Sequence, residues 1–316
     1  MQAQSHDNMR LLSRAPRSRT PFAPFSCLVT KAATTGPGPT QHDAPQFQGA
    51  GTHIGVFDSG LGGLSVLRAL HARLPLADLT YVADSGHAPY GERDGEFIAS
   101  RSLAICDFLV ERHVDAIVVA CNTATAAAIH LLRKAHPGVP IIGVEPGVKP
   151  AVAQSINKRI GVLATPSTLA SEKYKRLIES HGQGATIVPQ ACPGLAKEIE
   201  AGQLDTPALK DLVERFAQPL REAQVDTVVL GCTHYPFVAP LFQQALGSDV
   251  TIMDTSDAVA QHTARLCAHR QGTTANWGVN HKFAGKIHLF SSGDPQHLAD
   301  VARHWLGLQG TVSPLP

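Results

Sequence analysis

VDAIVVAC at residues 114–121 returns as VDTVVLGC at residues 225–232. A second pair repeats at nearly the same spacing, because IGV occurs at residues 54–56 and again at residues 160–162. Such internal similarity marks copies of one structural unit, and two copies are too few for a solenoid. The chain is therefore predicted to form two similar α/β domains that face each other across a pseudo-twofold axis.

The first copy indicates how each domain is built. Short apolar stretches alternate with stretches whose apolar residues recur at helical spacing. This alternation is typical of βαβ units, and strands that are apolar throughout fit a parallel sheet covered on both faces. The expected strands are residues 54–57, 79–83, 116–120 and 140–144, and the expected helices are residues 64–74, 98–111 and 125–136. The predicted fold class is α/β, with two doubly wound parallel sheets and an active site in the cleft between them.

Composition excludes several classes of protein. The 316 residues carry 27 Lys and Arg against 26 Asp and Glu, a net charge of +1, which gives no electrostatic reason to expect a nucleic acid or an anionic membrane as partner. No apolar run reaches the roughly 18 residues that span a bilayer. Six cysteines are too few for a disulfide scaffold, and no CxxC or zinc-type Cys/His spacing occurs. We expect a protein of the reduced cytoplasm without a metal site.

Residues 1–50 differ from the rest of the chain. They contain five basic but only two acidic residues, and no apolar periodicity is sustained. We predict a disordered, basic, proline-rich tail that catalysis does not need, so that a chain starting near Ala50 keeps full activity. A misassigned start codon and an organelle transit peptide are the alternatives. The first domain is expected over residues 51–147 and 256–316, and the second over residues 148–255.

Each copy of the repeat ends in a cysteine. Cys121 and Cys232 come just past the carboxyl end of an apolar strand, which is the edge where open parallel sheets bind ligands. Free cysteines are often small buried hydrophobes, so either one alone indicates little. Matching positions in two copies, each followed by polar residues, favour a shared chemical role. We expect both thiols to face one cleft from opposite sides.

Two facing thiols suit a particular kind of reaction. A protease-like site needs one nucleophile and one base, and a redox pair needs thiols close enough to bond. Two equivalent acid/base groups on opposite faces of one carbon suit a symmetric reaction, in which one thiolate removes a proton and the other thiol returns one. Such a reaction inverts a stereocentre and needs no cofactor.

Five segments carry a resemblance to a known family. They are IGVFDSGLGGLSVLRAL (54–70), YVADSGHAPYGER (81–93), VVACNTAT (118–125), GVEPGVKPA (143–151) and LGCTHYPF (230–237). Together they resemble glutamate racemase over roughly residues 53–306. The resemblance implies cofactor-independent interconversion of L- and D-glutamate, which supplies D-glutamate for peptidoglycan. Family members differ in how they dimerise, so the resemblance leaves a homodimer open.

The resemblance also implies roles for particular residues. Cys121 is expected to act on the D-enantiomer and Cys232 on the L-enantiomer. Asp58 and His234 are expected to assist Cys121 and Cys232 respectively. Glu200 matches a family glutamate near the second thiol, although its motif, KEIEAG, is looser here. The positions that match substrate contacts are Asp58, Ser59, Tyr90, Gly91, Asn122, Thr123, Thr233 and His234.

Several of these positions also suit an amino-acid substrate on chemical grounds. Asp58 lies between a strand and a helix, where its carboxylate can bind an ammonium group. Gly60, Gly62 and Gly63 are expected to leave backbone N–H groups free near a helix start for a substrate carboxylate. Turn and helix-cap roles are the alternative for the Asp, Asn and Thr residues. The neutral donors expected to bind a carboxylate are Asn122, Thr123 and Thr233.

Three other functions are weighed against racemisation of glutamate. The order strand, GLGGLS (60–65), helix, strand and Asp84 superficially copies a dinucleotide-binding fingerprint, but Ser65 takes the place of its third glycine. A related racemase acting on aspartate or another α-acid is the second alternative, against which CTHYP (232–236) favours glutamate. A binding module without activity is the third, although both cysteines and Asp58 are present.

Overall fold

A computed structural model describes residues 49, 51–271, 285–308 and 311–316. These residues belong to one compact unit, Pro45–Pro316. The expectations for residues 1–50 concern positions that lie, apart from Gly49, outside the described residues.

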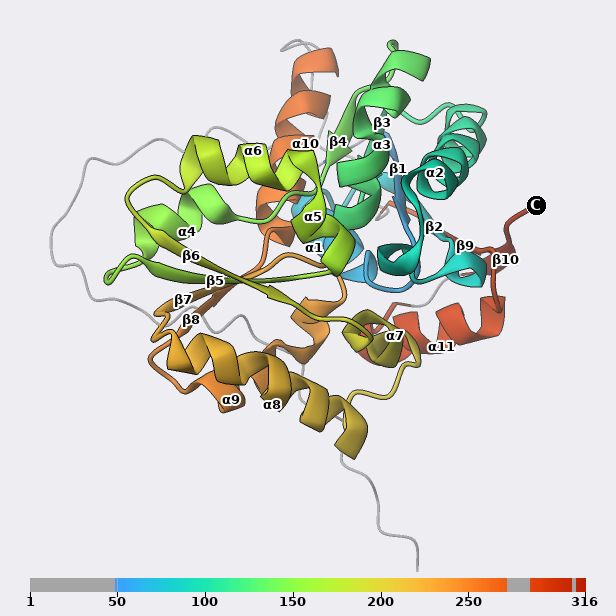
Figure 1. Cartoon of the computed structure of the whole chain (residues 1–316). Coiled ribbons are helices and arrows are strands. Elements are labelled where there is room, and N and C mark those ends of the chain that lie inside the picture. Colours follow the sequence, from blue (N-terminus) through green and yellow to red (C-terminus); the bar gives the residue numbers. More distant parts are fainter. Residues whose placement is uncertain (1–48, 50, 272–284, 309–310) are drawn as a thin grey trace, which may run out of the picture. The chain divides into compact units, whose positions relative to one another are not determined.

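The first sheet has six strands in the order β10-β9-β2-β1-β3-β4, and every neighbouring pair is parallel (Figure 1). The chain returns to this sheet after building the second one, since β9 and β10 join it next to β2. Its strands are β1 (His53–Asp58), β2 (Asp78–Ala83), β3 (Ala116–Val119), β4 (Ile141–Gly143), β9 (Ile287–Ser291) and β10 (Val312–Pro314).

The second sheet has four parallel strands in the order β6-β5-β7-β8. Its strands are β5 (Arg159–Ala164), β6 (Thr186–Ala191), β7 (Thr227–Leu230) and β8 (Thr251–Met253). The register repeats with the sequence, because Ile54 of β1 pairs with Ala116 and its counterpart Ile160 of β5 pairs with Thr227. The structure confirms the predicted α/β class with two parallel sheets.

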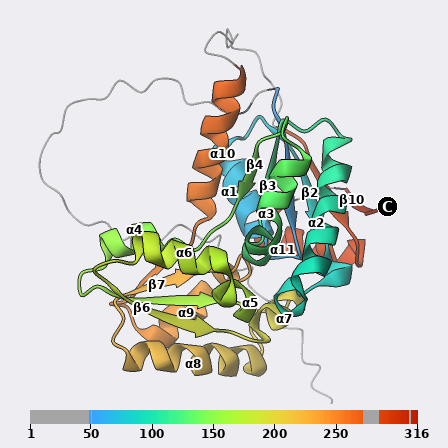
Figure 2. The same cartoon turned by 45° about the horizontal axis from the view of Figure 1, so that its top comes forward.

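Helices cover both faces of each sheet, as Figures 1 and 2 show. On the first sheet, α1 (Leu64–Arg73), α10 (Ser256–Gln271) and α11 (Pro295–Leu306) share one apolar core, while α2 (Gly95–Val110) and α3 (Asn122–Ala135) share another. On the second sheet, α7 (Leu195–Glu200), α8 (Pro207–Glu222) and α9 (Ala239–Leu246) cover one face. The opposite face carries α4 (Val148–Gln154), α5 (Pro166–Ala170) and α6 (Glu172–His181). Three short 3-10 helices, η1 (Ser85–His87), η2 (Tyr90–Glu92) and η3 (Tyr235–Val238), lie in loops.

Two helices begin earlier than the apolar pattern predicts. Helix α3 starts at Asn122 rather than residue 125, because Cys121 caps it and its Sγ accepts the Ala124 N–H at 3.4 Å. Helix α2 starts at Gly95 rather than residue 98, because the Asp94 carboxylate accepts the Phe97 N–H at 2.8 Å. Apolar periodicity does not mark the first turn of these helices, because the side-chain atoms that cap the free N–H groups determine where each helix begins.

The strands of each sheet lie within the limits predicted for one domain. Strands of the first sheet lie within residues 53–143 and 287–314, and those of the second lie within residues 159–253. The limits at residues 147 and 255 stay a prediction, since the described residues form one compact unit.

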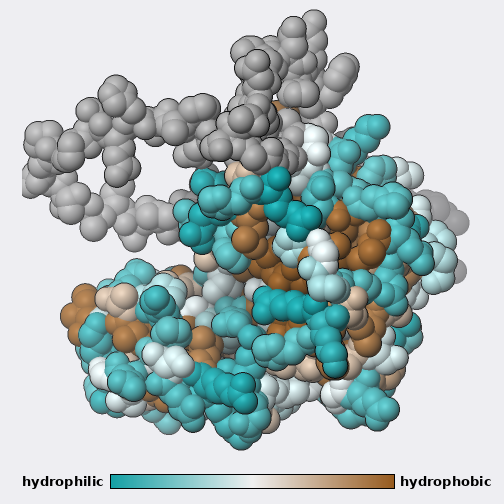
Figure 3. Space-filling model, turned by 90° about the horizontal axis from the view of Figure 1, so that it is seen from above, coloured by the Kyte–Doolittle hydropathy of each residue, from teal (hydrophilic) through white to brown (hydrophobic). Residues whose placement is uncertain are grey.

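The surface of the described residues is mostly hydrophilic on the face in Figure 3, with hydrophobic residues in separate patches. Among the described residues, the large hydrophobic side chains that are exposed are those of Leu131 and Ile156. None of the described helices is long and apolar enough to cross a membrane.

Candidate active site

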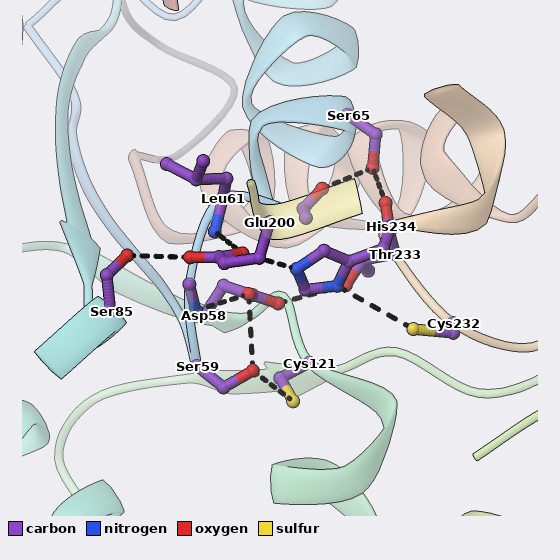
Figure 4. A network of polar contacts seen from close by, with 12 residues as sticks. Asp58, Ser59, Leu61, Ser65, Ser85, Cys121, Glu200, Cys232, Thr233 and His234 are labelled. Atoms are coloured by element: carbon purple, nitrogen blue, oxygen red, sulfur yellow. Dashed lines mark hydrogen bonds and ion pairs between the residues drawn. The ribbon is translucent and has the colours of Figure 1, made fainter. Parts of the chain in front are cut away.

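The two repeat cysteines take equivalent places in the two sheets. Cys121 lies two residues beyond the end of β3, and Cys232 lies two residues beyond the end of β7. Both are buried, at 5% and 7% exposure. Figure 4 shows the two sulfur atoms beside one network of polar side chains that come from both sheets.

Cys121 is linked to the Asp58 carboxylate through the Ser59 hydroxyl group. Its Sγ lies 3.6 Å from Ser59 Oγ, which in turn lies 3.5 Å from Asp58 Oδ1 (Figure 4). Burial raises the pKa of the Cys121 thiol to about 12, and the negative charge of Asp58 acts in the same direction. Cys121 is therefore a neutral thiol, which is a proton donor.

Asp58 is fully buried at the end of β1. Its Oδ1 accepts the Gly60 N–H at 2.7 Å, and its Oδ2 accepts the Thr233 hydroxyl at 2.9 Å across the two sheets. Burial raises the pKa of Asp58 to about 6, although the neighbouring charge of His234 partly opposes this rise. The carboxylate thus changes its charge close to the neutral pH range.

Cys232 borders a cationic ring instead. His234 Nδ1 lies 3.7 Å from Cys232 Sγ, and His234 Nε2 lies 2.6 Å from Glu200 Oε2. Burial alone lowers the pKa of His234, but its hydrogen bonds to Cys232 and Glu200 outweigh burial and raise it well above the ordinary value. Burial likewise opposes ionisation of Glu200, yet its bonds to His234 leave the pKa of Glu200 lowered. The result is an imidazolium–carboxylate pair next to the second sulfur.

Glu200 also connects the two sheets. It ends α7 on the second sheet, yet its Oε2 accepts the Leu61 N–H at 2.8 Å and its Oε1 accepts the Ser85 hydroxyl at 2.8 Å. Leu61 and Ser85 follow β1 and β2 of the first sheet. The glutamate with the loosest sequence motif thus lies at the centre of the network (Figure 4).

The expectation of a free backbone N–H is wrong for Gly60, and it stays a prediction for Gly62 and Gly63. The Gly60 N–H binds the Asp58 carboxylate and the Leu61 N–H binds Glu200, so both N–H groups are already taken by the protein's own carboxylates. A Cβ at Gly60 would overlap the Glu200 carboxylate, and one at Gly62 would overlap the His234 ring. These glycines let side chains from the second sheet approach the backbone of the first.

Tyr90 and Gly91 lie at one wall of this region. The Tyr90 side chain is buried, and its hydroxyl donates to Asp84 Oδ2 at 2.6 Å, so a substrate contact at this residue falls to its backbone. The Gly91 carbonyl accepts the Ser167 hydroxyl at 3.2 Å, and a Cβ at Gly91 would lie 3.1 Å from the Thr165 side chain. Residues 90–91 therefore pack directly against the start of α5.

Sequence reasoning missed two threonines. Thr123 Oγ1 lies 3.1 Å from Thr165 Oγ1 and 3.4 Å from Thr168 Oγ1, so that hydroxyl groups from both sheets form one cluster. A signal was present, because extending the IGV repeat makes Thr165 the counterpart of Ser59.

Asn122 carries a free donor at this site. The residue is 5% exposed, and its Nδ2 has no hydrogen-bond partner among the described residues. Buried polar atoms almost always have a partner. This amide is thus available to a ligand.

Comparisons with known proteins identify the family. The family model for Asp/Glu/Hydantoin racemase matches residues 63–263. The glutamate racemase of Methylococcus capsulatus is 48% identical over 265 residues, which cover 83% of this chain and 95% of that protein. The chain belongs to the glutamate racemase family. Its relative from Herpetosiphon aurantiacus is 47% identical over 78% of this chain and 95% of that protein.

Solved structures of glutamate racemases share the fold. Isoform RacE1 from Bacillus anthracis superposes with a TM-score of 0.75 at 32% identity, covering 84% of this chain and 98% of that one. The Escherichia coli glutamate racemase in complex with L-glutamate and the activator UDP-MurNAc-Ala gives 0.72 at 29% identity, with 84% and 98% covered. Membership of the glutamate racemase family favours racemisation over the dinucleotide-binding alternative.

Proposed function

We propose that this glutamate racemase interconverts L- and D-glutamate by two proton transfers at Cα, and that it supplies D-glutamate for peptidoglycan in the cytoplasm. Cys121 and Cys232 serve as the two acid/base groups. The observation that carries the proposal is that a buried cysteine lies two residues beyond the end of each of two equivalent strands, and that the two cysteines have neighbours of opposite charge.

The charges favour one starting state. The imidazolium of His234 lies beside Cys232 Sγ, where it can stabilise the negative charge of a sulfur that takes up the α-proton, while burial, together with the charge of Asp58, keeps Cys121 protonated. With L-glutamate bound, the Cys232 thiolate takes the α-proton, and the Cys121 thiol delivers its own proton to the opposite face of the carbanion. The product is D-glutamate with a Cys232 thiol and a Cys121 thiolate. The reverse reaction uses the same groups in the opposite roles.

The remaining groups bind the substrate. Asp58 suits the ammonium group, and the backbone at Tyr90 and Gly91 forms part of the wall. Substrate binding by both Asp58 and Thr233 has to break the hydrogen bond between them, because that bond engages both side chains. The neutral donors that suit the carboxylates are Asn122, Thr123 and Thr233, of which Asn122 holds a free buried N–H.

Alanine variants test this proposal. Cys121→Ala and Cys232→Ala should each lose at least about 100-fold of racemisation in both directions, because one turnover uses both thiols. Circular dichroism follows each enantiomer, after dialysis against a chelator and without added pyridoxal phosphate. Cys267→Ala is the matched control, since it removes another buried thiol from α10. Full activity in either single variant, or activity that returns only with a cofactor, would refute the proposal.

A further inference from the structure

Asp84 is a buried carboxylate that the proposed proton transfers do not use. It follows β2 directly and is 0% exposed. Arg101 donates a hydrogen bond to each of its oxygens, from Nε to Oδ2 at 3.0 Å and from Nη2 to Oδ1 at 2.7 Å. The Tyr90 hydroxyl donates to Oδ2 at 2.6 Å, and His87 Nδ1 lies 3.0 Å from Oδ1. Burial opposes ionisation, but the bonds from Arg101 and Tyr90 leave the pKa of Asp84 lowered.

This carboxylate ties a loop to a helix. Arg101 belongs to α2, whereas His87 and Tyr90 belong to the short helices η1 and η2 between β2 and α2. Without the Asp84 carboxylate, the buried Tyr90 hydroxyl would lose the acceptor of its hydrogen bond. The loop between β2 and α2 would also lose its link to Arg101 of α2.

The same loop reaches the second sheet at two points. The Ser85 hydroxyl donates to Glu200 at 2.8 Å, and the Gly91 carbonyl accepts from Ser167 at 3.2 Å. Gly91 packs so closely on Thr165 that there is no room for a side chain without movement. A displacement of the loop therefore shifts its contacts with Glu200, Ser167 and Thr165 of the second sheet.

We infer that Arg101 and Asp84 are positioning residues, which fix the wall at Tyr90 and Gly91 and thereby set the affinity for glutamate. The inference rests on the proposed function, because that function makes the wall part of the substrate site. Arg101 suits the task since its planar guanidinium binds both carboxylate oxygens at once, which a lysine ammonium cannot do.

Kinetics of Arg101 variants test the inference. Arg101→Met removes the paired hydrogen bonds and keeps the length of the stem, and KM for glutamate should rise about tenfold while kcat changes less than about threefold. Arg101→Lys should give an intermediate KM. Arg133→Met is the matched control, because Arg133 also donates two hydrogen bonds from a helix but to the Ile141 carbonyl. Its KM should stay unchanged.

Further variants test the role of Arg101 and Asp84 even if Arg101→Met does not fold. If Arg101→Met does not fold by circular dichroism, Tyr90→Phe removes one hydrogen bond to the same carboxylate and should also raise KM. The effects of the Lys and Phe variants should be less than additive in the double variant. Folded Arg101 variants with the KM of the unaltered chain would overturn the inference. Failure of the unaltered chain to racemise glutamate would instead refute the proposed function, and calorimetric binding of L-glutamate to the same variants would still test the role of Arg101.

Discussion

At the level of single residues, Asp58 and His234 give two equivalent cysteines opposite surroundings. The repeat predicts where both sulfurs lie, because it fixes the strand ends. It does not predict their charge states, because those depend on side chains that reach the site from other elements. His234 is cationic because its hydrogen bonds to Cys232 and to Glu200, which arrives from α7, together outweigh burial. Symmetry of the backbone thus coexists with asymmetry of the acid/base groups.

Stability should respond to the buried charge of Asp58. Its pKa rises from an ordinary value near 3.8 to about 6, so the folded chain binds this proton more tightly than the unfolded chain does. Asp58→Asn should therefore stabilise the protein by about 2–3 kcal/mol at about pH 8, where the carboxylate is charged in both states. The gain should shrink as the pH falls through 6 and vanish near 4. Urea unfolding at several pH values measures it.

Asp84→Asn provides a comparison of opposite sign. Because the pKa of Asp84 is lowered in the fold, its charge stabilises the protein above an ordinary carboxyl pKa, and this contribution is lost as the pH falls. Removing the charge should destabilise the protein at about pH 8. A loss of stability in Asp58→Asn at that pH would contradict our account of the Asp58 site.

Isotope effects should separate the two assisting side chains. Asp58→Asn should slow proton abstraction from D-glutamate, and His234→Asn should slow abstraction from L-glutamate, because Asp58 is linked to Cys121 through Ser59 whereas His234 borders Cys232. Equilibrium between the enantiomers cannot change, so the asymmetry must appear in primary isotope effects with α-deuterated substrate of each hand. Equal effects from both sides in both variants would show that the two residues do not act on separate thiols.

At the level of elements, the segment between β1 and α1 shows how far sequence reasoning reaches. The glycines mark a tight segment after a strand, and the structure has one there. Their purpose could not be predicted, because Glu200 and His234 come from segments that are more than 130 residues away along the chain. A contact between two segments that lie far apart along the chain produces no hydrophobic periodicity in the sequence of either segment.

Gly62→Ala tests whether close approach explains these glycines. The new methyl group would overlap the His234 ring, so kcat should fall about 10-fold or more as the ring moves from Cys232. Gly95→Ala is the matched control, since a Cβ there meets no atom within 4 Å. Steady-state kinetics from L-glutamate measures both. Unchanged kcat in Gly62→Ala would contradict the explanation.

Strand and helix positions were largely predictable, and polar networks were not. Apolar runs located β1 to β4 to within two residues at each end, because burial requires them. The pairing of Arg101 with Asp84 depends on rotamers and loop course, which hydropathy does not encode. The position of Thr165 can be predicted from the IGV repeat, but only when the repeat is extended past the end of the strand.

At the level of the whole described unit, the two sheets meet through polar contacts at the site. Thr233 bonds Asp58, Ser167 bonds Gly91, and Glu200 bonds both Leu61 and Ser85. The bonds at Asp58, Thr233 and Gly91 engage groups that the proposed function assigns to substrate. On that proposal, binding of glutamate exchanges these contacts between the sheets for contacts with the ligand.

Glu200→Gln should weaken both the site and the contact between the sheets. A neutral amide cannot hold His234 cationic or accept all three bonds, so kcat from L-glutamate should fall about 10–100-fold and the free energy of unfolding by about 1–3 kcal/mol. Glu198→Gln on the same helix is the control and should change neither. Kinetics and urea unfolding measure the two effects. Unchanged values in Glu200→Gln would remove Glu200 from the account.

Deuterium incorporation distinguishes two thiols that share each turnover, each acting on its own face of Cα, from a single base. In deuterated water, starting from L-glutamate, the first D-glutamate formed should carry deuterium, because Cys121 exchanges with solvent before it delivers its proton. Unreacted L-glutamate should stay mostly protonated, since Cys232 removes a proton and does not return one to the same face. Mass spectrometry of the separated enantiomers at early times gives both values. Deuterium that accumulates equally early in L-glutamate would indicate a single base and contradict the pairing of Cys121 with Cys232.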